Sequence, residues 1–126
     1  MEQLARLHHE ETTGVDFGRL EELIAEYGEA GAERHLGRML ECIAVRLNKC
    51  ERAWDARDNR GLRNAAQDVV GYAAEIGLTK LEAVANDVLT TLASAQPAAQ
   101  GATVARLVRI GEASLMCAWD LDSSFL

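Results

Sequence analysis

The feature that most constrains this chain is a long stripe of apolar residues with helical periodicity. Between residues 36 and 54, apolar side chains recur at steps of three and four over roughly five helical turns. The stripe consists of Leu36, Met39, Leu40, Ile43, Leu47, Cys50 and Trp54. A helix with one apolar side must bury that side against an apolar partner, so this pattern is typical of a bundle helix.

The same periodicity predicts a shorter helix before this one and three helices after it. The expected helices cover roughly residues 17–27, 36–54, 61–76, 79–93 and 103–119. Their boundaries rest on local signals: an N-cap at Asp16, a stop at Gly28, a cap at Asp58 or Asn59, a stop at Gly77, and a capping box of Thr79 and Glu82. Residues 94–101 contain Pro97 and three alanines, and we expect a loop there.

These elements predict an all-α protein, an antiparallel four-helix bundle with an additional short N-terminal helix. The link around Gly77 is only about two residues long, which favours an antiparallel hairpin of the helices on either side. We expect the bundle to occupy residues 15–120, with a flexible or short helical N-terminus over 1–14 and a tail over 121–126. A chain of 126 residues suits one domain.

The charge balance and the cysteines restrict the classes of partner and site. With 13 Lys and Arg against 20 Asp and Glu, the net charge is −7, which disfavours nucleic acid and anionic membranes as partners. No apolar run approaches the ~20 residues of a membrane span, and the polar first residues do not resemble a secretory signal. Three cysteines without a C-x-x-C pair predict reduced thiols in a cytoplasmic protein, with no metal site and no cofactor.

One side of the predicted helix 61–76 is unusual for a surface that faces solvent. The apolar stripe of this helix includes Val69, Ala73 and Ile76. At about 100° per residue, Gln67 lies on the opposite side of the helix and shares that side with Arg63, Val70, Gly71 and Ala74. This side carries one charge and otherwise mostly small or apolar residues. A glycine inside a helix costs about 1 kcal/mol relative to alanine, so Gly71 indicates a requirement for packing or access.

The segment from Ala66 to Leu78, Ala-Gln-Asp-Val-Val-Gly-Tyr-Ala-Ala-Glu-Ile-Gly-Leu, resembles the signature of histidine-phosphotransfer (HPt) domains. That signature reads Ala-His-x-Leu-Lys-Gly, then small residues, then Leu-Gly-Ala, then a capped helix. The positions that fit are Ala66, Gly71, Ala73, Ala74, Ile76 and Gly77, with Leu81, Ala85 and Leu89 on the next helix. Weaker matches extend the resemblance over residues 15–120, and it implies the helical bundle predicted above.

The resemblance also implies a histidine on the bundle surface that accepts phosphate from an aspartate of a response-regulator receiver domain. A lysine three residues later attracts the phosphoryl group in that family. This chain has Gln67 and Val70 at those two positions. An amide nitrogen is not a nucleophile near neutral pH because its lone pair is delocalised, whereas imidazole has a free lone pair. We therefore expect a protein that is no enzyme but keeps the docking surface.

Three functional hypotheses follow. The first is a binding module that docks a receiver domain or a histidine kinase, and its contact residues are Arg63, Gln67, Asp68, Val70, Gly71, Ala74 and Glu75. The second is an active phosphotransfer protein that uses another histidine, His35, beside the second helix. The third is a structural helical bundle without a signalling role, joined into a homodimer through apolar residues of the outer side such as Val70 and Ala74. The sequence leaves the choice between monomer and homodimer open.

Overall fold

Four helices account for nearly all of the described chain, so the prediction of an all-α protein is confirmed. The computed structural model describes residues 14–94 and 96–124. The helices are α2 (Phe17–Asp55), α3 (Asn59–Ile76), α4 (Thr79–Ser94) and α5 (Pro97–Ser124). Within those residues the extended contact is a single antiparallel bridge between Val15 and Leu78. None of the described helices is long and apolar enough to cross a membrane.

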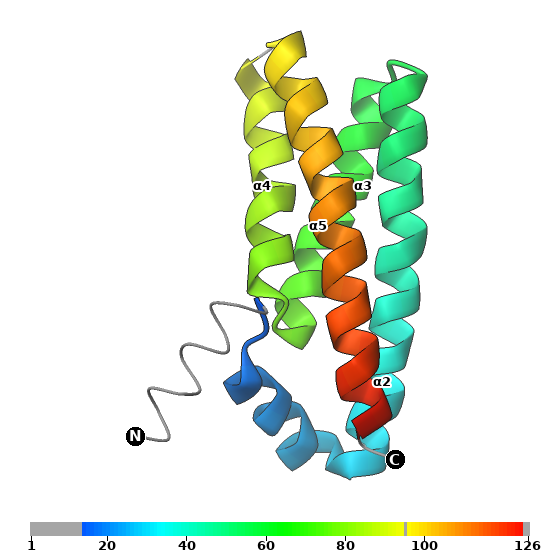
Figure 1. Ribbon diagram of the computed structural model, residues 1–126, viewed down its shortest axis with the longest axis vertical. Helices are drawn as coiled ribbons and strands as arrows, with labels where there is room; N and C mark the ends of the chain where they lie inside the picture. The colour runs from blue at the N-terminus through cyan, green and yellow to red at the C-terminus, as the bar shows by residue number, and fades with distance from the viewer. Residues whose placement is uncertain (1–13, 95, 125–126) are drawn as a thin grey trace.

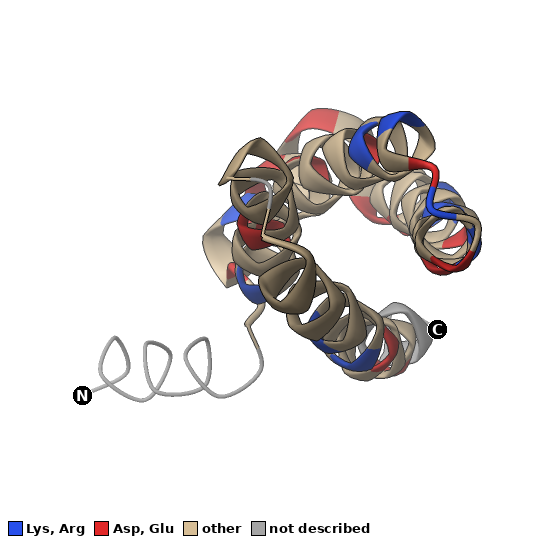
Figure 2. Ribbon diagram, turned by 90° about the horizontal axis from the view of Figure 1, so that it is seen from above, with Lys and Arg blue, Asp and Glu red and all other residues tan. Residues whose placement is uncertain are grey.

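The helices pack as a bundle around a shared apolar interior. They lie side by side in Figure 1, and the view from above in Figure 2 shows them surrounding a common centre. Helix α2 packs against α3 and α5, and α4 packs against the same two helices. The residues with no exposed surface come from all four helices, among them Leu40, Ile43, Leu62, Val69, Ile76, Leu81, Val88 and Leu107. Most of them belong to the apolar stripes of the sequence, because one-sided stripes can be buried together only in such a bundle.

Helix α2 is interrupted at Gly28, where the first predicted helix was expected to stop. Gly28 has φ 74° and ψ 168°, a conformation that side chains rarely adopt. Residues 17–27, blue in Figure 1, turn away from the long helix and lie at the lower end of the bundle. Residues 29–35 are helical, although the apolar stripe does not reach them. They contain helix formers such as Ala30, Glu33 and Arg34, and of these residues only Ala32 is buried.

The predicted loop over residues 94–101 is wrong. Helix α4 continues to Ser94, and α5 already begins at Pro97. Proline suits the first turn of a helix because its φ is already helical and an N–H at that position would have no partner within the helix. The alanines that follow are strong helix formers. The composition that suggested a loop is therefore also compatible with the start of a helix. Helix α5 also runs past its predicted end at residue 119, as far as Ser124.

The turn between α3 and α4 anchors the segment that precedes α2. Gly77 ends α3 with φ 78°, as predicted, and its carbonyl accepts a hydrogen bond of 2.7 Å from the N–H of Asp16. Thr79 does not act as the N-cap of a capping box. It is the first residue of α4, and its hydroxyl donates to the carbonyl of Gly14 at 3.2 Å. The expected N-terminal element over 1–14 lies outside the described residues except for Gly14.

Candidate functional site

The outward side of α3 carries an exposed strip of four residues, which we call the α3 strip: Arg63, Gln67, Gly71 and Ala74. Asp58 caps the start of the helix by accepting a hydrogen bond of 2.9 Å from the N–H of Gly61. Val69 and Ile76 are fully buried and fix the rotation of α3 about its axis. Because Gln67 lies on the opposite side of the helix from these two residues, its amide points into solvent. The predicted orientation of this strip is therefore the one the structure has.

Gly71 has no packing role inside the protein. A Cβ atom added to this residue would find no described atom within 4 Å, and the residue itself is exposed. By contrast, a Cβ on Gly101 would come within 3.1 Å of the Trp54 ring. The absence of a side chain at Gly71 therefore leaves open space on the outer surface, one turn from Gln67.

Val70, the residue at the lysine position of the HPt signature, is half-buried and packs against the core. It lies at the edge of the α3 strip on the side opposite to Asp68, since the two residues are separated by about 160° around the helix. An aliphatic side chain there offers a partner apolar contact but no charge for a phosphoryl group.

Asp68 does not belong to the exposed strip but lies at the seam between α3 and α2. Its Oδ2 atom is 2.9 Å from Nε of Arg46, which is buried and makes no aligned hydrogen bond with the described residues. The contact is therefore an ion pair across the seam. Burial, with a smaller contribution from the charge of Asp68, raises the pKa of the Cys50 thiol to about 12. The sequence predicts Asp68 as a contact residue, but part of its charge is already used inside the protein.

Glu75 is likewise held by internal contacts. Its Oε1 atom accepts a hydrogen bond of 3.1 Å from Arg19 and lies 3.2 Å from Nε2 of His35. Its backbone carbonyl accepts a second bond of 2.8 Å from Nε of Arg19. Glu22 as a hydrogen-bond acceptor, together with the charge of Glu75, raises the pKa of the Arg19 guanidinium. Glu75 thus connects the segment before Gly28, the long part of α2 and α3, so its first role is structural.

His35 lies away from the α3 strip, on the side of α2 that packs against α3. Its side chain is 17% exposed, and its ring stacks at a tilt on Tyr27 with 5.4 Å between the ring centroids. The Nε2 atom faces the carboxylate of Glu75, which would repel an incoming phosphoryl group. This environment is typical of a structural histidine.

The sequence reasoning missed Val45, which is 53% exposed on α2. It directly precedes Arg46, whose ion pair with Asp68 places it level with Gln67 on the neighbouring helix. Val45 does not belong to the apolar stripe of α2, and an apolar residue outside such a stripe is the sequence pattern that indicates an exposed position. An exposed valine on α2 adds one apolar contact point to the outer surface of the bundle.

The α3 strip presents one guanidinium, one amide and two small residues to the solvent. No histidine lies on the α3 strip, and no group of three His, Cys, Asp or Glu side chains within the described chain could hold a metal ion. Comparisons with family models, with curated proteins and with solved structures found no match. The functional assignment therefore depends on the geometry and on the signature-like segment of α3.

Proposed function

We propose that this protein is an HPt-like docking module of two-component signalling. It binds a response-regulator receiver domain or a histidine kinase in the cytoplasm and carries no phosphate at the usual position. The observation that carries the proposal is the exposed amide of Gln67, beside an open glycine, at the place where the signature has its histidine. A docking surface needs shape and apolar contact, and it survives the loss of a nucleophile.

The arrangement of the helices supports an antiparallel bundle with an extra N-terminal helix, the architecture that the HPt resemblance implies. Only residues 56–58 separate α2 from α3, and only residues 77–78 separate α3 from α4. Helices that pack side by side across such short turns must run in opposite directions. The segment 17–27 before Gly28 then corresponds to the additional short helix.

The rival functions have less support from the contacts. Phosphotransfer through His35 requires a free ring nitrogen and access for a receiver domain, but Nε2 faces Glu75 and the ring is mostly covered. A homodimer through Val70 and Ala74 requires an apolar outer surface, but Val70 packs against the core and only the small side chain of Ala74 is exposed. We therefore treat both rivals as outcomes of the experiment below.

The decisive experiment restores the missing nucleophile. Purified receiver domains from the same organism are charged with labelled phosphate and incubated with the wild-type protein, with Gln67→His, and with Gln67→His combined with Val70→Lys. We expect no label on the wild type and acid-labile label on both variants, with more on the double variant because the lysine attracts the phosphoryl group. Asn86→His is the matched control, because it adds an imidazole to an exposed position of α4.

The outcomes separate the three hypotheses. Label on the wild-type protein that disappears in His35→Ala would establish phosphotransfer through that histidine and defeat the proposal. Equal labelling of Gln67→His and Asn86→His would show that no receiver domain docks on α3. Concentration-dependent sedimentation of the wild type that is lost in Val70→Glu would favour the homodimer.

A further inference from the structure

The basic residues of this acidic protein are concentrated at one end of the bundle. Residues 46–63, which form the end of α2 and the start of α3, contain six of the 13 Lys and Arg but only three of the 20 Asp and Glu. In the view from above, blue segments gather where α2 passes into α3. The charge of this segment is therefore opposite in sign to the net charge of the whole chain, which is −7.

Near the end of α2, two cations and one acidic residue line different grooves. Lys49 and Arg52 line a groove of about 360 Å³ between α2 and α3, which we call the basic groove; its other lining residues are Ala53, Ala56, Asp58 and Gly61. Glu51 lines a separate groove of about 290 Å³ between α2 and α5, together with Glu112. At this end of α2, Lys49 and Arg52 thus face α3, whereas Glu51 faces α5.

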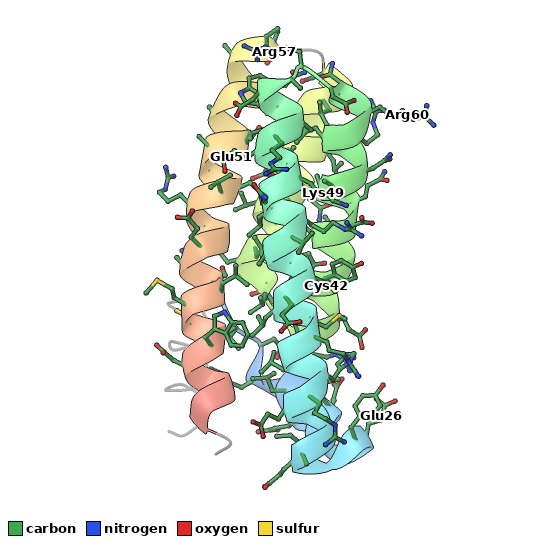
Figure 3. All side chains as sticks on the ribbon, turned by 90° about the vertical axis from the view of Figure 1, so that its right-hand side faces the viewer. Glu26, Cys42, Lys49, Glu51, Arg57 and Arg60 are labelled. Atoms are coloured by element: carbon green, nitrogen blue, oxygen red, sulfur yellow. The ribbon has the colours of Figure 1, made fainter. Side chains whose placement is uncertain are left out.

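Four cations at the basic groove and on the adjoining α3 surface have no internal partner. Lys49, Arg52, Arg60 and Arg63 are exposed, and none makes an ion pair with another described residue. Figure 3 shows Lys49 at the front of the face formed by α2 and α3, and Arg60 projecting from its upper edge. Arg34, Arg38, Lys80 and Arg109 are also exposed and make no ion pair with a described residue, but they are spread over other parts of the chain. The unpaired cations are available to an outside partner.

The basic groove adjoins the start of the α3 strip, because Gly61 lines the groove and Arg63 begins the strip two residues later. Arg63 belongs to the strip and precedes Gln67 by one helical turn, and Arg60 lies about one turn further toward the groove. On α2, Lys49 follows the Arg46–Asp68 ion pair by three residues. A partner that covers Gln67 therefore meets these cations at the rim of its contact surface.

We infer that the partner docked on the α3 strip is a protein that presents an acidic surface to the basic groove, an inference that rests on the proposed function. Exposed rim charges act over about 10 Å at ordinary ionic strength, so they steer approach and select partners. Nucleic acid fits less well, because the chain outside residues 46–63 is strongly acidic and repels an extended polyanion. In this arrangement the α3 strip supplies the contact surface, and the basic groove orients the partner on it.

The test compares two double variants that change the net charge equally. Lys49→Glu with Arg52→Glu reverses the basic groove, while Arg34→Glu with Arg109→Glu reverses two exposed cations elsewhere. The affinity of each for the receiver domain that the wild type binds is measured by calorimetry at low and high salt. We expect the groove variant to weaken binding about tenfold or more at low salt and the control to change it less than about twofold. Equal losses in the two variants would overturn the inference.

Two further measurements keep the inference separate from the proposed function. If Ala74→Arg abolishes receiver binding while the groove variant binds normally, the function stands and the inference fails. If no receiver domain binds, a short oligoglutamate peptide is titrated into the isotope-labelled wild-type protein, and the backbone amide shifts are followed by NMR. Saturable amide shifts confined to Lys49, Arg52, Arg60 and Arg63 would support an acidic partner, and shifts spread over the surface would reject it. Tighter binding of a single-stranded oligodeoxynucleotide at the same residues would also reject it.

Discussion

Replacing Gly71 by alanine should stabilise the fold while it changes the docking surface. Gly71 lies inside α3, is exposed, and has open space where a Cβ would be added. The added methyl group therefore creates no clash. It removes the conformational freedom that glycine keeps in the unfolded chain, and so the native state gains relative to the unfolded state.

The size of the effect follows from helix propensity. Alanine is favoured over glycine by about 0.8–1.0 kcal/mol in an exposed helix interior, and compatible replacements in proteins give about 0.4–1 kcal/mol. We therefore expect the free energy of unfolding to rise by about 0.5–1 kcal/mol. For a domain of this size that corresponds to a rise in Tm of roughly 2–6 °C.

Urea unfolding followed by far-ultraviolet circular dichroism measures this change, and Gly77→Ala provides the matched control. Gly77 has φ 78°, and a Cβ there would lie 2.9 Å from the backbone oxygen of Asp16. Since an L-residue in the left-handed region costs about 1–2 kcal/mol, the same chemical change should destabilise the protein at this position. The comparison separates helix propensity from local backbone conformation within one helix and its cap.

A destabilised Gly71→Ala variant would refute the reasoning, because it would mean that the residue is packed or strained in solution. A variant that is both more stable and weaker in receiver binding would show that a stabilising change at this position is harmful to docking. Ala83→Val on the exposed side of α4 controls for a general effect of enlarging a surface residue.

Two other predictions concern the contacts inside the bundle. Arg19→Ala removes the hydrogen bonds to Glu75 and Glu22 and should lower the stability of this contact by about 1 kcal/mol, which is measured as faster amide hydrogen exchange over residues 15–27. Arg19→Lys should recover part of this protection. Unchanged exchange in Arg19→Ala would contradict the anchoring role of Glu75. Because the pKa of Cys50 is raised from its ordinary 9.0 to about 12 in the folded state, the unfolded chain loses that proton first, and stability should fall as pH rises through this window. The free energy of unfolding should fall by about 1.4 kcal/mol per pH unit in this window because of Cys50. A Cys50→Ala variant whose free energy of unfolding has the same pH slope as the wild type would disprove this role of Cys50.

The apolar stripes, together with the glycines that end them, determined most of the helix positions. The stripe from Leu36 to Trp54 lies within α2, and Gly28 and Gly77 interrupt or end helices where expected. The stripe of α3 also determined which side of that helix faces outward. These features depend on residues within a few turns of one another, and for that reason local sequence is sufficient.

The mistaken loop over residues 94–101 shows where local signals are ambiguous. Proline and glycine occur in loops and also at helix starts, and composition does not separate the two cases. In the structure Gly101 lies against the Trp54 ring, which lets α5 approach the end of α2 closely. A contact between residues so far apart in the chain leaves no trace in a local window.

The internal partners of the polar residues on α3 were decided only by the tertiary structure. Asp68 and Glu75 are among the contact residues that the sequence predicts, but the packing of α2 gives them Arg46, Arg19 and His35 as partners. The same packing places Lys49 and Arg52 in one groove with α3. Periodicity specifies the side of a helix on which a residue lies, but the register between two helices depends on their whole buried surfaces, and it is this register that selects each polar partner.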